Sequence, residues 1–69
     1  MFSIDLHGLS HKDAKASLEL FINENWGKRI KVITGNSEPM KDIVCSLVHF
    51  YGLSCRRDSL LGYVIIHEH

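Results

Sequence analysis

Three residues near the start of the chain are of types that suit the binding or cleavage of a phosphate group. Asp5 and His7 are two residues apart, and Gly8 follows directly. Residues two apart on an extended strand project from the same face, so Asp5 and His7 can act together. An imidazole titrates near neutral pH, which suits a general acid or base in phosphodiester cleavage, or a hydrogen-bond donor to a phosphate. Asp5 can orient that imidazole, or the two residues can form a structural pair with no chemistry.

A helix start is predicted immediately after these residues. Gly8 allows a tight turn or a close approach of the backbone to a ligand. Ser10 is followed three residues later by Asp13, the Ser-x-x-acid spacing typical of a helix N-terminus. Unpaired amide groups converge at such a terminus and favour an anion. The segment therefore predicts an anion site beside His7.

Apolar periodicity predicts the elements that position this site, in the order βαβαββ. Strands are expected over residues 1–7, 29–34, 53–58 and 62–67. Helices are expected over residues 10–26 and from Pro39 to just before Gly52. The predicted core comprises Leu18, Ile22, Ile30, Val32, Ile33, Ile43, Val44, Leu47 and Ile65. The fold class is α/β, an α+β two-layer sandwich, in one domain spanning residues 1–69.

The loop after the second strand should lie beside His7. Strands joined by a right-handed crossover are parallel, so their carboxyl ends share one edge of the sheet. Thr34, Gly35, Asn36 and Ser37 end the second strand and offer hydroxyl, amide and main-chain donors for a phosphate. Alternatively, Asn36 or Ser37 simply turns the chain and caps the next helix. The loop lacks the lysine of a Walker-type phosphate loop, so nucleotide hydrolysis is not indicated.

These motifs resemble the Smr (small MutS-related) domain family over essentially the whole chain. The family's Leu-Asp-Leu-His-Gly segment corresponds to residues 4–8, and its acid-alanine pair to Asp13-Ala14. Its Thr/His-Gly-x-Gly loop corresponds to residues 34–37, with Ser37 in place of the second glycine. The last family strand, which usually opens with glycine, corresponds to residues 62–68.

The resemblance implies a fold similar to the C-terminal domain of bacterial translation initiation factor three. In that fold the last strand of a four-stranded mixed sheet lies between the second and third. Family members bind DNA or RNA and several nick or cleave it, which implicates His7 and the Thr34-Gly35-Asn36 loop. Ser37 restricts the loop and puts catalysis in more doubt than binding. The alternative is a catalytically silent protein-interaction or accessory domain, alone or within a larger parent protein.

Basic and aromatic residues offer further contacts for a nucleic acid. Two short clusters, 28–31 and 56–57, can track a phosphate backbone, although a solvated sheet edge is the more ordinary explanation for any one of these residues. The predicted nucleic-acid-binding set comprises Gly8, Lys12, Lys28, Arg29, Thr34, Gly35, Asn36, Ser37 and Lys41. Trp26 and Tyr63 can stack on bases, or cover the end of the first helix and pack on the sheet.

Composition narrows the remaining possibilities. Eight acidic and eight basic residues balance, so net charge argues for no particular partner. The chain shows no membrane-spanning run and no signal-peptide pattern, which predicts a cytoplasmic protein with no membrane partner. Cys45 and Cys55 are then expected to be reduced core residues, although a bridge between them is conceivable.

Metal and cofactor sites are not indicated by the sequence. The terminal histidines of residues 67–69 share a face, but two ligands do not make a site. No cofactor is expected, and a divalent metal is not indicated. Leu20, Leu60 and Leu61 fall outside the predicted core and suggest an apolar patch for a partner or a dimer, or side chains that are simply partly buried.

Overall fold

Two helices and a four-stranded mixed sheet form an α+β sandwich with the predicted order of elements. The computed structural model describes residues 2–57 and 61–68. The elements are β1 (Phe2–Asp5), α1 (His11–Glu24), β2 (Ile30–Ile33), α2 (Glu38–Phe50), β3 (Ser54–Arg57) and β4 (Tyr63–His67). The βαβαββ prediction is confirmed, with elements slightly shorter than expected. Asp58, the predicted end of the third strand, lies outside the described residues, as do Ser59 and Leu60 of the predicted connection and the terminal Met1 and His69.

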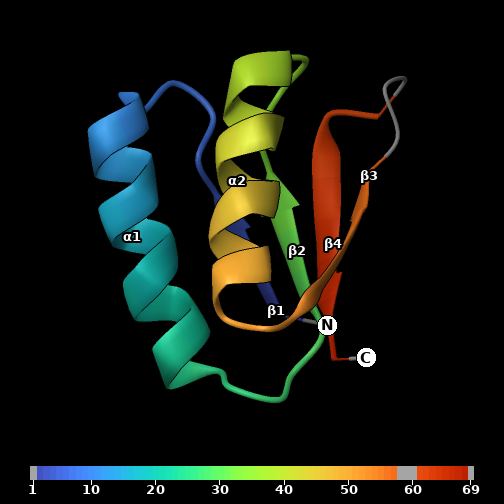
Figure 1. Cartoon of the computed structure of the whole chain (residues 1–69). Coiled ribbons are helices and arrows are strands. Elements are labelled where there is room, and N and C mark those ends of the chain that lie inside the picture. The colour runs from blue at the N-terminus through green and yellow to red at the C-terminus, as the bar shows by residue number, and fades with distance from the viewer. Residues whose placement is uncertain (1, 58–60, 69) are drawn as a thin grey trace.

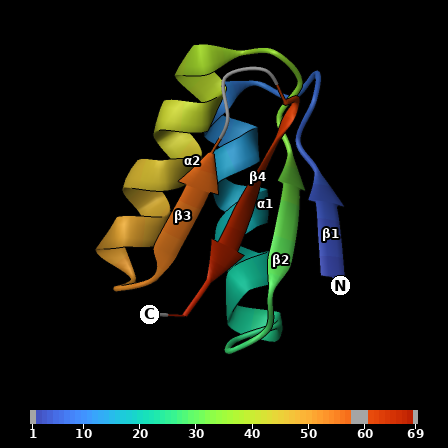
Figure 2. The ribbon, with the colours of Figure 1, turned by 90° about the vertical axis from the view of Figure 1, so that its right-hand side faces the viewer.

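The strand order in the sheet is β1-β2-β4-β3. β1 and β2 are parallel, whereas β4 is antiparallel to both β2 and β3. The last strand therefore lies between the second and third, as the resemblance implied (Figure 2). Because β1 and β2 are parallel, the loops that follow them lie at the same edge of the sheet (Figure 1).

Both helices cover the same face of the sheet (Figure 1). Alternate residues of each strand face them, as the two-residue period requires. The fully or nearly buried hydrophobic residues include Leu6, Ala14, Leu18, Ile22, Ile30, Val32, Val44, Leu47, Val48, Val64 and Ile66. Six of the nine predicted core residues are among them.

Three predicted core residues are only half-buried. Ile33 and Ile65 alternate with the buried strand residues and so belong to the opposite face of the sheet, which no helix covers. Ile43 lines a groove between the helices. The prediction failed for Ile33 and Ile65 because hydrophobicity alone does not say which face of a strand is covered. It failed for Ile43 because this residue lies on the side of α2 that lines the groove.

Serine hydroxyls cap both helices, as the local patterns predicted. The Ser10 hydroxyl accepts a hydrogen bond from the Asp13 main-chain N–H at 3.1 Å. The Ser37 hydroxyl accepts one from the Met40 N–H at 3.2 Å. Such caps satisfy N–H groups that have no partner within the helix.

The prediction that both cysteines are reduced is wrong. Cys45 in α2 and Cys55 in β3 form a disulfide, with Cα atoms 5.6 Å apart. Cys55 pairs with the buried Ile66 and therefore faces α2. Its proximity to Cys45 follows from the way β3 lies against α2, which residue spacing could not reveal.

No helix in the described part of the chain is long and apolar enough to cross a membrane.

Candidate nucleic-acid interface

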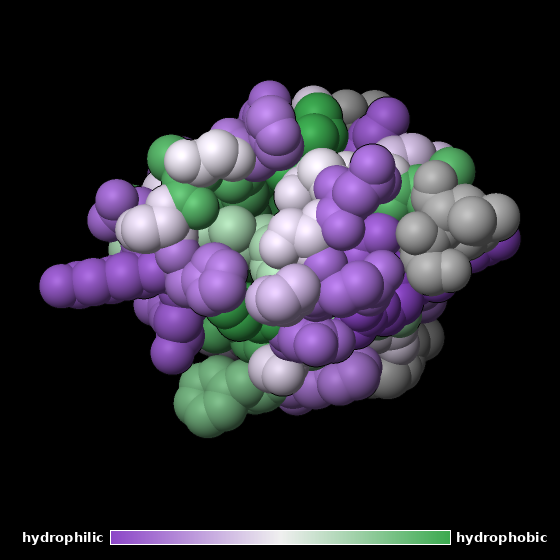
Figure 3. Space-filling model, turned by 90° about the horizontal axis from the view of Figure 1, so that it is seen from above, coloured by the Kyte–Doolittle hydropathy of each residue, from purple (hydrophilic) through white to green (hydrophobic). Residues whose placement is uncertain are grey.

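His7 and the Gly35 loop meet at the edge of the sheet where both helices begin. The contact is close: a Cβ atom on Gly35 would lie 2.7 Å from Cδ2 of His7. His7 as a whole is solvent-exposed. The predicted convergence of these two segments is therefore confirmed. Figure 3 looks down on this edge, where the surface is mostly hydrophilic.

Gly62, directly before β4, holds the Gly35 loop in place. Its carbonyl oxygen accepts hydrogen bonds from the main-chain N–H groups of Thr34 and Gly35, at 2.9 and 3.0 Å. The Thr34 hydroxyl donates to the Gly35 carbonyl at 2.9 Å, and Thr34 is only 2% exposed. These hydrogen bonds position the loop. Sequence reasoning missed the role of Gly62, although the glycine that opens the last family strand was its signal.

Asp5 fixes the turn after β1. Its carboxylate accepts a hydrogen bond from the main-chain N–H of His7 at 2.9 Å. Gly8 follows with φ +85°, a conformation that favours glycine, and open space lies where its Cβ would be. Asp5 therefore bonds to the backbone of His7, which is the structural pairing that was the alternative to orienting the imidazole.

Of the remaining loop residues, Asn36 is exposed and Ser37 is half-buried as the cap of α2. Lys12 is exposed in the first turn of α1. Lys41 is fully buried, with its ammonium 3.7 Å from a Glu38 carboxylate oxygen. The structure therefore does not present the charge of Lys41 at the surface, where the predicted contact with a nucleic acid would require it.

Two other predicted contacts lie elsewhere. Lys28 and Arg29 are exposed but directly precede β2, whereas His7 follows β1. Since β1 and β2 are parallel, these two basic residues lie at the opposite end of the sheet from His7 (Figure 1). The structure thus does not gather the predicted set into a single site.

The two arginines of β3 separate onto opposite faces of the sheet. Arg57 faces α2 and donates hydrogen bonds to Asp42 at 2.7 Å and Glu38 at 2.6 Å. These two bonds raise the pKa of the Arg57 guanidinium above its usual value. Arg56 is exposed on the uncovered face. The sequence presented the two residues as one cluster, but strand alternation divides them.

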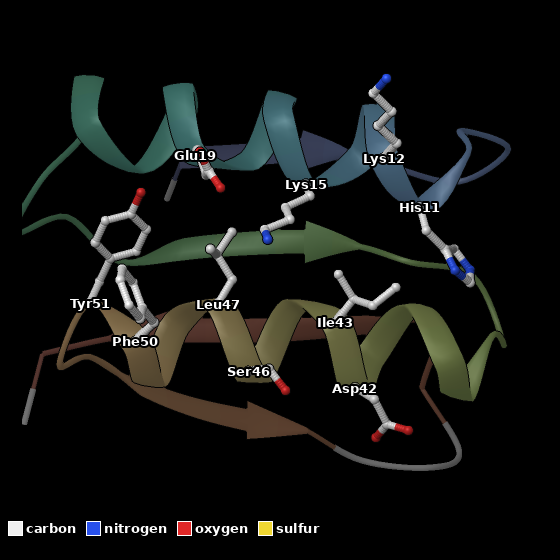
Figure 4. Close-up of a pocket in the computed structure, with 10 residues that line it drawn as sticks. All are labelled: His11, Lys12, Lys15, Glu19, Asp42, Ile43, Ser46, Leu47, Phe50 and Tyr51. Carbon is white, nitrogen blue, oxygen red and sulfur yellow. The ribbon is translucent and has the colours of Figure 1, made fainter.

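A groove of about 900 Å³ separates α1 from α2 (Figure 4). Ile43 and Leu47 lie along it, and Phe50 and Tyr51 lie toward the end of α2. Phe50 is 82% exposed. Its ring packs edge-on against Tyr51, and Tyr51 against Trp26, with centroids 5.7 and 6.2 Å apart. Trp26 thus contacts the end of α2, in line with a packing role for its ring.

The described residues contain no group of three or more histidine, cysteine or acidic side chains able to hold a metal ion. His67 belongs to β4 and its Nδ1 lies 2.9 Å from the Glu68 carbonyl oxygen.

No protein-family model, curated protein or solved structure matches the chain. The fold places the chain in the class of α+β two-layer domains, with an open and mostly hydrophilic edge where both helices begin.

Proposed function

We propose that this chain is an Smr-like domain that binds DNA or RNA at the edge formed by His7 and the Gly35 loop. The observation that carries the proposal is the exposed imidazole packed against Gly35, between the N-termini of two helices. A donor in that position can bond a phosphate oxygen, and the helix dipoles favour the negative charge. Lys12, exposed in the first turn of α1, adds a positive charge.

Binding is better supported than cleavage. The Asp5 carboxylate accepts a hydrogen bond from the main-chain N–H of His7, which does not support Asp5 as the acid that orients the ring for proton transfer. A nicking activity would depend on His7 as the proton-transferring group.

A cytoplasmic location belongs to the same proposal. The Cys45–Cys55 disulfide weighs against it, because the cytosol keeps thiols reduced.

Replacing His7 tests the proposal directly. His7→Ala should weaken binding of labelled DNA and RNA, and abolish any nicking measured with and without a chelator. Its thermal midpoint should hardly change, because the exposed ring contributes little packing. His49→Ala is the matched control, since His49 is an exposed histidine at the far end of α2. If His7→Ala melts far lower while its folded fraction binds normally, His7 is only an anchor for the Gly35 loop.

The groove between the helices favours a second candidate function, an accessory domain that binds a protein. Phe50 is 82% exposed and lies beside this largely apolar groove. Exposed aromatic side chains next to apolar surface are common where proteins bind one another. The same titrations separate the two functions. Phosphate binding weakens steeply with added salt, whereas an apolar protein contact does not.

A further inference from the structure

No helix covers the face of the sheet opposite α1 and α2 (Figure 2). Lys31, Ile65 and Arg56 form one row across β2, β4 and β3. Ile33 and Tyr63 pair in the next row, toward the His7 edge. We call these five residues, together with His67 at the end of β4, the open face.

Positive charge dominates the open face. Lys31 and Arg56 lie on either side of Ile65, about 10 Å apart given the usual spacing of strands. Neither forms an ion pair with another residue within the described ranges 2–57 and 61–68. Within the four strands, Asp5 is the one acid on this side, and its carboxylate bonds to the His7 N–H. The charge therefore suits a polyanion.

Tyr63 supplies a planar surface next to these charges. The ammonium of Lys31 lies 4.3 Å from the centroid of the Tyr63 ring, a cation–π contact. The ring is half-buried beside Ile33. An aromatic side chain among basic residues on an exposed surface is the combination by which proteins hold single-stranded nucleic acid, because bases stack on the ring while cations contact phosphates.

The open face is continuous with the proposed His7 site. Tyr63 directly follows Gly62, whose carbonyl oxygen holds Thr34 and Gly35. A strand bound at His7 can therefore pass over Tyr63 and onto the row of Lys31 and Arg56 without leaving the surface.

We propose that the open face is a platform for single-stranded nucleic acid, with one base stacked on Tyr63 and phosphates contacted by Lys31 and Arg56. This inference rests on the proposed function and specifies its ligand. The incoming base displaces the Lys31 ammonium from the ring, which frees that charge for a phosphate. A second copy of this chain would bring like charges together, and a duplex keeps its bases inside the helix.

The test compares fluorescein-labelled single strands of fifteen thymidines or fifteen uridines with a duplex of equal length, over a salt series. The protein should bind the single strands more tightly than the duplex. Tyr63→Leu should weaken single-strand binding by about 5- to 150-fold, whereas Tyr63→Phe should bind like the parent. Arg56→Gln should reduce the slope of log affinity against log salt by about 0.7.

Arg57→Gln is the matched control, because Arg57 neighbours Arg56 but faces α2 and already bonds two acids. It should leave the affinity unchanged, and thermal melts should show that every variant is folded. The platform is refuted if Tyr63→Leu and Arg56→Gln bind as the parent does, or if a fifteen-residue polyglutamate binds as tightly as the single strands. If those two variants bind normally while His7→Ala does not, the His7 site stands without the platform. If His7→Ala alone binds normally, the proposed His7 site fails.

Discussion

Substituting Gly35 by alanine tests whether the imidazole of His7 is held against the loop in solution. Gly35 has φ +69°, where an L-residue costs roughly 1–2 kcal/mol more than glycine. The added Cβ would also lie 2.7 Å from Cδ2 of His7, so the ring must move. Gly35→Ala should therefore lower the free energy of unfolding by about 1–2 kcal/mol from the backbone, plus the cost of displacing the ring.

The two contributions are separated by a double-mutant cycle. In a His7→Ala background the new methyl group meets no ring, so Gly35→Ala should cost only the backbone term. The difference between the two backgrounds should be at least about 0.5 kcal/mol, the lower end for residues in contact. Gly52→Ala is the control, because Gly52 has φ +76° but nothing within 4 Å of the added Cβ. Its cost should be the same in both backgrounds.

Urea unfolding of these proteins under oxidising conditions, with linear extrapolation, gives each free energy. Equal costs for Gly35→Ala with and without His7 would mean that the ring does not pack on Gly35. The observation that carries the proposed function would then be lost. A coupling for Gly52 as large as that for Gly35 would show that the cycle reports a global effect of His7→Ala.

Two further predictions concern stability. Leu47→Ala should lower the free energy of unfolding by ~2–5 kcal/mol, because Leu47 is only 6% exposed. If urea unfolding shows a loss below ~0.5 kcal/mol, the Leu47 side chain lies on the surface. Leu20, which is 65% exposed, is the control, since its truncation should cost less than ~0.5 kcal/mol. Reducing the Cys45–Cys55 disulfide, whose cysteines are ten residues apart, should cost about 3 kcal/mol by the chain-entropy relation. Unchanged urea midpoints with and without reductant would argue that the bridge is not formed.

Local signals in the sequence predicted the elements and the site edge well. Ser10 and Ser37 cap the two helices because the hydroxyl of a serine just before a helix can accept a hydrogen bond from the main-chain N–H three residues later. The convergence of His7 with Gly35 followed from parallel pairing alone. Both inferences depend on neighbours in sequence or on a topological rule, so neither required knowledge of packing.

The failures share a cause, which is that one-dimensional spacing does not show which face of an element is covered. Lys41 is charged yet fully buried beside Glu38. Ile33 and Ile65 are apolar yet lie on the uncovered face of the sheet. The Cys45–Cys55 disulfide depends on β3 packing against α2. In each case tertiary packing decides, and a residue's own chemistry gives no sign of it.

The arrangement of the basic residues bears on the kind of ligand that the proposed function requires. Lys28 and Arg29 lie before β2 and His7 lies beyond its end, so about 13 Å of strand separates them. A mononucleotide cannot reach both ends of the strand, whereas a polymer with a negative charge on every repeating unit can. Lys31 and Arg56 lie between those ends on the uncovered face. Dispersed cations that form no single pocket are therefore consistent with a polymeric ligand, and they argue against a small phosphorylated metabolite.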